Sequence, residues 1–250
     1  MILLFHAFAA EVHPIIARLT EASALPDAAV RGQQGKISGV PVTLVASGIG
    51  MRRSRLAAGR AMDSLPAAEL VIISGVAGAL RDNLAVGHPV LGQRLITRRS
   101  DDDFQPEQIL DIPSEYFVRL ATALEAAQID YTAGAMMTSR RALTTSADKR
   151  RAHTESGAIT VDMESAAIAF EAQRRGLPFV CLRTILDTAS EDVVGAALAD
   201  ENGEVRALAA AKALITHPRM IGGVVHLLRN LRLAASSLAS TLEAILPRIS

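Results

Sequence analysis

Carboxylate side chains and one arginine follow short apolar runs of this sequence. They are Glu11, Asp162, Glu164, Arg183 and Asp187. A carboxyl group can protonate a leaving group, accept a proton from water or hold hydroxyl groups, and an arginine beside it stabilises its charged form. Taken singly, each acid is equally typical of a helix cap or a turn. Acid–base chemistry therefore depends on whether the fold brings these residues to one place.

The elements expected around these residues are strands and helices in alternation. Short aliphatic runs predict strands at 1–8, 40–46, 70–73, 89–97, 159–162 and 179–185. The stretches between them predict helices at 10–22, 54–64, 114–127, 147–153 and 165–175. This alternation predicts an α/β fold, a single-domain three-layer sandwich with a mixed, mainly parallel central sheet covered by helices.

The carboxyl ends of parallel strands are the place where such folds bind ligands. The acids and Arg183 lie near or just after the ends of predicted strands on that side, and a glycine-rich segment at 74–78, SGVAG, follows another. We therefore expect one shared site, built from carboxylates and a glycine-rich loop.

Composition and charge exclude several kinds of protein. The 250 residues are 50% hydrophobic and 21% charged, which is too apolar for a disordered chain. The 26 basic residues balance 26 acidic ones, so the formal net charge is zero and nothing favours nucleic-acid binding. The single cysteine, Cys181, excludes an intramolecular disulfide and any paired-cysteine metal or redox site. With no credible secretory signal and no apolar run of about 18 residues, we expect a cytoplasmic protein.

Sequence motifs for common cofactors are missing. We find no GxxxxGK[ST] phosphate loop, no HExxH metal motif and no GxSxG nucleophile motif. The segment 48–50, GIG, lacks the third glycine of a dinucleotide-binding fingerprint because position 53 is arginine. The six histidines are scattered, and the acidic triplet at 101–103 is typical of a solvated loop. We therefore expect neither a metal nor an organic cofactor.

The C-terminal part has a different pattern. Apolar residues recur at helical spacing over 220–245, and polar residues fall largely on the other side. We therefore divide the chain into a main α/β domain at 1–215 and an amphipathic helical extension at 216–250. The amphipathic segment has two interpretations. It packs on the body or on a partner subunit, or it meets lipid as an interfacial helix.

Four motifs together resemble the family of nucleoside phosphorylases and nucleosidases that includes methylthioadenosine/S-adenosylhomocysteine nucleosidase. FHAFAAEV at 5–12 is similar to the family's first strand and its acid, and SGIG at 47–50 to one of its turns. SGVAG at 74–78 with LAVG at 84–87 is similar to a third motif, and VDME at 161–164 with RTILD at 183–187 to the fourth. Their order and spacing hold from residue 1 to about 192. VDMES at 161–165 and the tail at 217–249 most resemble the hopanoid-associated phosphorylase branch, which acts on adenosylhopane.

The resemblance implies a role for each matching residue. Asp187 is expected as the general acid that protonates or hydrogen-bonds N7 of the purine, because the adenine anion is a poor leaving group. Glu164 is expected to hold the ribose hydroxyls, with Met163 packed under the sugar. Glu11 is expected to orient the nucleophilic water. The remaining implied residues are Arg183, Gly50 and Val76 at the nucleophile site and Ala142, Leu143 and Asp162 at the base.

Two departures from the family pattern bear on the reaction. Phosphorolytic members resemble Arg-x-Gly-Ser at the third strand end, where this chain has Ile73, Gly75 and Val76. A phosphate dianion needs arginine forks and backbone N–H donors, so the change favours hydrolysis, with inorganic phosphate as a co-substrate the alternative. Where relatives have Phe-Ile near the base, this chain has Arg141-Ala142, which alters the expected base pocket.

These features predict a purine nucleosidase that releases adenine from an adenosine-type nucleoside, with adenosylhopane in hopanoid biosynthesis as the first candidate. The alternatives are a methylthioadenosine/S-adenosylhomocysteine nucleosidase, a nucleoside phosphorylase, or a non-catalytic nucleoside- or lipid-binding module on the same fold. The retained acids argue against a binding module, since a binder needs no general acid. The family also implies a homo-oligomer, because a neighbouring subunit completes its sites. A lipid nucleoside would bring the 220–245 segment to the inner membrane as a peripheral contact.

Overall fold

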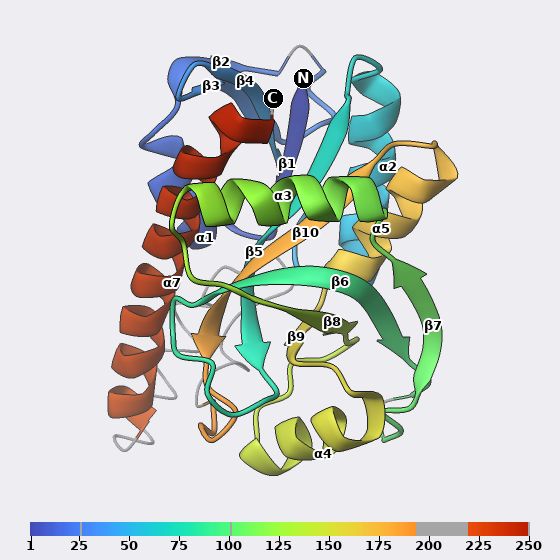
Figure 1. Cartoon of the computed structure of the whole chain (residues 1–250), viewed down its shortest axis with the longest axis vertical. Coiled ribbons are helices and arrows are strands. Elements are labelled where there is room, and N and C mark those ends of the chain that lie inside the picture. Colours follow the sequence, from blue (N-terminus) through green and yellow to red (C-terminus); the bar gives the residue numbers. More distant parts are fainter. Residues whose placement is uncertain (26, 101, 194–219, 250) are drawn as a thin grey trace.

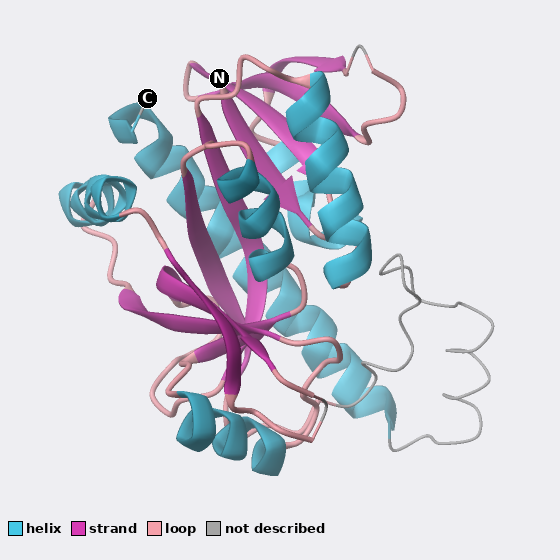
Figure 2. Cartoon of the chain, turned by 90° about the vertical axis from the view of Figure 1, so that its right-hand side faces the viewer, coloured by secondary structure: helices cyan, strands magenta, loops and turns pink. Residues whose placement is uncertain are grey.

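The structure is a computed structural model that describes residues 1–25, 27–100, 102–193 and 220–249 (Figure 1). Strands join one large mixed sheet, and helices lie on both sides of it (Figure 2). The strands are β1 (Ile2–His6), β2 (Thr20–Ala24), β3 (Gly32–Ile37), β4 (Val40–Ala46), β5 (Leu70–Ala79), β6 (Pro89–Arg98), β7 (Pro106–Asp111), β8 (Thr132–Thr138), β9 (Thr160–Asp162) and β10 (Phe179–Asp187). The helices are α1 (Ala9–Ile16), α2 (Met51–Ser64), α3 (Ser114–Ala126), α4 (Ser146–Ser156), α5 (Ser165–Arg174) and α7 (Met220–Ile249).

Four parallel strands form the middle of the sheet in the order β4, β1, β5 and β10. Ile2 pairs with Val42 on one side and with Leu70 on the other, and Phe179 pairs with Val71. These strands are rich in aliphatic residues because helices cover both of their faces and exclude water. The predicted α/β fold with a mixed sheet is confirmed, and parallel pairing holds in this central part.

The sheet closes on itself beyond these strands. β10 pairs with β6, β6 with β8, β8 with β9, and β9 with β5, which pairs again with β10. The antiparallel pair of β5 and β9 sets Gly78 opposite Val161, and the parallel pair of β5 and β10 sets Gly78 opposite Asp187. This closure therefore brings the ends of three strands, and the predicted site residues on them, to one place.

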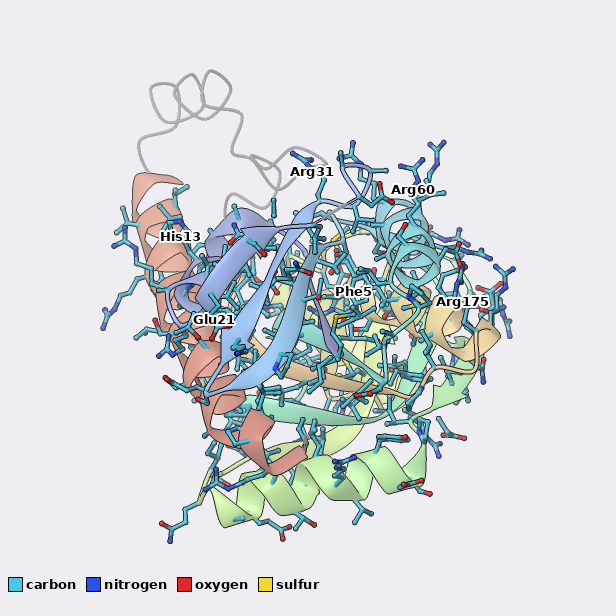
Figure 3. The ribbon with its side chains drawn as sticks, turned by 90° about the horizontal axis from the view of Figure 1, so that it is seen from above. Phe5, His13, Glu21, Arg31, Arg60 and Arg175 are labelled. Atoms are coloured by element: carbon cyan, nitrogen blue, oxygen red, sulfur yellow. The ribbon has the colours of Figure 1, made fainter. Side chains whose placement is uncertain are left out.

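The helices form an outer layer on each side of the strands. α2 packs against α5, and α7 packs against α1, α3 and β10. Seen from above, α1 and α7 lie on one side and α2 and α5 on the other, with Phe5 in the interior between them (Figure 3). The buried aliphatic side chains of the central strands form the main core, which both layers share.

Some predicted boundaries are wrong, and four strands were not predicted. The helix expected at 10–22 ends at Ile16, and Thr20–Ala24 forms β2, antiparallel to β3. Every residue of β2 is exposed, so no burial pattern marks it. β3 (GQQGKI) and β7 (PEQILD) are largely polar, and β8 (TAGAMMT) begins with small residues. A Cβ atom at Gly134 in β8 would lie 2.6 Å from Ile159, so close approach explains one of these small residues.

Helix α7 confirms the helix predicted at 220–245 and extends it to Ile249. In its second half, Leu238, Leu242 and Ile245 are buried in the same core as β1, so this half packs on the body of the protein. In its first half, Val225 and Leu228 are exposed. None of the described helices has the length and apolarity needed to cross a bilayer. The predicted division between 1–215 and 216–250 lies outside the described residues.

Candidate active site

Arg183 is the buried cation at the centre of the site. It lies on β10 and is 1% exposed. Its Nη2 is 3.0 Å from Oδ2 of Asp162 and 3.9 Å from Oε2 of Glu164, and its Nη1 is 3.8 Å from Oε1 of Glu11. One guanidinium therefore faces three buried carboxylates, and the cluster carries more negative than positive charge if all are ionised.

Asp162 fixes Arg183 in place. Its Oδ1 accepts hydrogen bonds from the Thr138 hydroxyl at 2.9 Å and from the N–H groups of Glu164 and Ser165 at 3.1 Å. The Ser165 hydroxyl donates to Oδ2 and accepts from Nε of Arg183. Both carboxylate oxygens of Asp162 are thus engaged within the protein. Asp162 thereby ties Arg183 to the start of α5, and the base-binding role that the family resemblance implied for it stays a prediction.

Glu11 is held by two backbone donors at the edge of the cluster. Val76 N–H donates to Oε1 at 3.0 Å, and Ala7 N–H donates to Oε2 at 3.2 Å. Burial raises the pKa of Glu11 to about 7, and the nearby charge of Arg183 opposes that shift. A carboxyl group with a pKa near neutrality can take up and release a proton during turnover.

Glu164 is bound at the start of helix α2. The N–H of Gly50 donates to Oε1 at 2.8 Å, and the N–H of Met163 donates to Oε2 at 3.3 Å. Gly50 has a φ of +89° and immediately precedes the helix, a conformation that favours glycine. The pKa of Glu164 is raised to about 7, because burial and then the charge of Asp162 raise it by more than Arg183 lowers it.

Asp187 ends β10 and pairs with a lysine. Its Oδ2 is 2.5 Å from Nζ of Lys149, which is fully buried. Burial raises the pKa of Asp187, and the positive charge of Lys149 opposes this. The carboxylate lies over Gly78, where a Cβ atom would be 3.1 Å from Oδ2. Asp187 is therefore fixed at the wall by a cation that sequence reasoning did not include in the site.

A cavity of about 290 Å³ joins these groups. All but one of the predicted site residues line it, namely Glu11, Val76, Ala142, Leu143, Asp162, Met163, Glu164, Arg183 and Asp187. The exception is Gly50, which reaches the site through its hydrogen bond to Glu164. The first half of α7 supplies an apolar wall through Val224, Leu227, Leu228 and Leu231. Among the described residues, no three histidine, cysteine or carboxylate side chains are arranged to hold a metal ion.

Comparison of this chain with known protein families shows the family to which it belongs. Residues 2–217 match the description "Phosphorylase superfamily". The match covers most of the chain and includes every residue of the carboxylate cluster. This chain belongs to the phosphorylase superfamily. The prediction that the chain is an enzyme of this family, a purine nucleosidase or nucleoside phosphorylase, is confirmed.

Relatives of this superfamily member include nucleosidases. A 5′-methylthioadenosine/S-adenosylhomocysteine nucleosidase of Haemophilus ducreyi is 28% identical over 198 residues, covering 74% of this chain and 84% of that one. A mutant Helicobacter pylori nucleosidase with 5′-methylthioadenosine in its active site has a TM-score of 0.76 and 19% identity, over 98% and 97% of the two chains. The futalosine hydrolase of Helicobacter pylori has a TM-score of 0.76 and 20% identity, over 98% and 97%. The two structures show a shared fold.

Two parts of this superfamily member's site were missed from the sequence. Lys149 is one of only three lysines in a chain whose other basic residues are arginines, yet its helix α4 is mostly exposed or half-buried and gave no sign of a buried charge. The apolar wall of α7 was found only as a helical stripe, with no indication that it faces the carboxylates. Both gaps concern contacts between segments far apart in the chain.

Proposed function

We propose that this enzyme cleaves the N-glycosidic bond of an adenosine-type nucleoside, releases adenine, and takes adenosylhopane as its preferred substrate. The observation that carries the proposal is the cavity itself. Its wall includes the carboxylates of Glu11, Glu164 and Asp187 and also the apolar side chains that α7 contributes. The carboxylates suit a ribosyl group and a purine, and the apolar side chains of α7 suit a hydrocarbon substituent on the 5′ carbon of the sugar.

The carboxylates can divide the chemical step among themselves. As the bond between C1′ and the purine breaks, its electron pair goes to adenine, and Asp187 gives a proton to N7. Positive charge develops on the ribosyl group, which the anionic cluster stabilises, while Glu164 holds the ribose hydroxyls. The oxygen of a water molecule bonds to C1′ and its proton passes to Glu11. Glu11 then releases this proton to solvent, and solvent returns a proton to Asp187, which completes the cycle.

The base is proposed to bind beside the loop that precedes α4. Ala142 and Leu143 line the cavity there, and Met163 lines it next to Glu164. These side chains are apolar, so they can pack on a flat purine and on the sugar without competing for its polar edge. Asp187 would then be the group that contacts N7 of the purine.

We propose hydrolysis rather than phosphorolysis. Arg183 is the only cation among the described residues that line the cavity, and it is paired with carboxylates. The N–H of Val76, a donor that a phosphate would need, is bound to Glu11. A phosphate dianion beside Arg183 and Val76 would meet the negative charge of the carboxylates, and the protein offers too few hydrogen-bond donors there to offset that repulsion. Water carries no such penalty.

The first half of α7 is proposed to touch the surface of the inner membrane. Val225 and Leu233 are 60% and 51% exposed, and Leu228 is both 45% exposed and part of the cavity wall. Arg229 and Arg232 lie on the same face as these residues. Apolar side chains flanked by arginines suit the boundary between acyl chains and anionic headgroups. A lipid nucleoside could then pass from the membrane to the cavity along Leu228. The expected cytoplasmic location and homo-oligomer are kept as part of this proposal.

The second candidate is a methylthioadenosine/S-adenosylhomocysteine nucleosidase. The relative from Haemophilus ducreyi favours it, and a methylthio group would also contact the apolar wall. The two candidates differ in the size of the apolar group, which the wall of α7 would recognise.

Adenine release from adenosylhopane and from methylthioadenosine, measured side by side with and without phosphate, separates the candidates. We expect kcat/KM for adenosylhopane to be at least about tenfold higher, which corresponds to about 1.4 kcal/mol. Faster release from methylthioadenosine would overturn the lipid assignment. Release that requires phosphate would overturn hydrolysis, and no release from either compound would overturn the proposed substrates.

A further inference from the structure

Lys149 is a buried cation outside the cavity. Its Nζ is 2.5 Å from Oδ2 of Asp187 and donates to the carbonyl oxygens of Thr188 and Glu191 at 2.8 Å each. The three hydrogens of the ammonium group therefore have three acceptors. Lys149 itself does not line the cavity, so any effect it has on a ligand passes through these partners.

Packing alone gives no reason for a lysine at this position. In helix α4 only Lys149 and Ala152 are buried. An uncharged side chain would fill the same space without the cost of removing an ammonium group from water, which is large unless the group is fully paired. The charge therefore has a use at its partner, and the partner with access to the cavity is Asp187.

The geometry points to Lys149 as a positioning residue for Asp187. Its ammonium group holds Oδ2, and Asp187 lines the cavity, so Oδ1 is the oxygen left to contact a ligand. The same contact sets the pH range in which the carboxyl group can donate a proton. This inference rests on the proposed role of Asp187 as the general acid.

The charges around Asp187 determine the direction of the effect. Burial and the carboxylate of Glu191 raise the pKa of Asp187, and Lys149 lowers it. Glu191 is itself bound to His226 of α7 at 3.0 Å. The pKa of Asp192 is lowered mainly by hydrogen bonds from Ser146, with a smaller contribution from the charge of Lys149. Lys149 is thus the single cation in direct contact with Asp187 among the residues that the structure describes.

The test is the pH dependence of adenine release by Lys149→Met. The variant should lose about 10- to 100-fold in kcat because the carboxylate is no longer oriented, with a smaller change in KM. The alkaline limb of its plot of kcat against pH should move to higher pH by about one unit or more, because the charge of Lys149 no longer opposes the effect of burial on the pKa of Asp187. Lys149→Gln, which keeps a donor and loses the charge, should show the same direction of movement. Arg150→Met removes an exposed cation from the same helix and should leave both the rate and the pH limb unchanged.

A double variant separates this inference from the proposed function. In an Asp187→Asn background, Lys149→Met should cost less than about twofold in single-turnover release, since its effect passes through Asp187. An unmoved alkaline limb in both lysine variants, or losses that multiply in the double variant, would overturn the positioning role. If Asp187→Asn alone releases adenine at the normal rate, the proposed general acid is wrong and the inference fails with it. Circular dichroism and thermal unfolding check that each variant is folded.

Discussion

Glu11 and Arg183 face each other across the backbone of Gly75, with Oε1 of the carboxylate 3.8 Å from Nη1 of the guanidinium. A Cβ atom at position 75 would lie 1.8 Å from that oxygen and 2.1 Å from that nitrogen. Gly75 also has a φ of +148°, which side chains other than glycine rarely allow. Glycine at this position is therefore a condition for the pair to form.

Gly75→Ala should destabilise the protein by about 3 kcal/mol or more, because the new methyl group displaces two buried charged side chains. Urea unfolding at neutral pH measures this loss. Gly157→Ala is the matched control, since Gly157 has a φ of +70° and nothing within 4 Å of an added Cβ. That control should cost only about 1–2 kcal/mol of backbone strain. Equal losses in the two variants would contradict the described contact.

Glu164→Gln should stabilise the fold at alkaline pH while it reduces adenine release. The pKa of Glu164 in the folded protein, about 7, lies above its usual value of 4.5. Stability that the protonated form supplies is therefore present below pH 4.5 and is lost as the pH rises through 7. Glutamine keeps an uncharged group at every pH. The free energy of unfolding of the variant, relative to that of the native protein, should therefore rise by about 1–3 kcal/mol from pH 5 to pH 8.

Denaturant unfolding of both proteins at pH 5 and pH 8 measures that gain. Glu115→Gln removes an exposed carboxylate in the first turn of α3, outside the cavity, and should show no comparable gain. If the stability of Glu164→Gln relative to the native protein falls from pH 5 to pH 8, the buried charge of Glu164 is not costly and the prediction is wrong.

The strand ends could be predicted from the sequence because their signal is local. Glu11, Glu164 and Asp187 each follow an apolar run that predicts a strand. The topology of a parallel sheet places the carboxyl ends of its strands at one edge. The closure of the sheet could not be predicted, since it depends on a three-residue strand, β9, pairing with β5. β2 was taken for helix because an exposed edge strand carries no pattern of burial.

The partners of the predicted residues were harder to find than the residues. Asp162 matches the family motif, yet only the structure reveals that Thr138, Ser165 and Arg183 occupy its oxygens. Lys149 lies on another element from Asp187, and no spacing in the sequence connects them. Side-chain pairs between distant segments are set by tertiary packing, which local patterns do not encode.

Leu228→Glu should weaken association with vesicles of phosphatidylglycerol and phosphatidylcholine by about tenfold or more, because it places a charge where an apolar side chain is proposed to enter the acyl boundary. Co-sedimentation with the vesicles measures this. Val118→Glu, at a position 58% exposed on α3, is the matched control and should leave association unchanged. Equal association of all three proteins would contradict an interfacial role for α7.

The central claim is that Asp187 donates a proton to the departing base. The most direct measurement is adenine release from adenosylhopane by the native protein and by Asp187→Asn, with substrate binding measured on the same samples. We predict a loss of about 10²- to 10⁴-fold in release, with binding changed by no more than a few fold. Asp111→Asn, which alters an exposed carboxylate at the end of β7, should behave as the native protein. Release by Asp187→Asn at the native rate, with binding intact, would contradict the account.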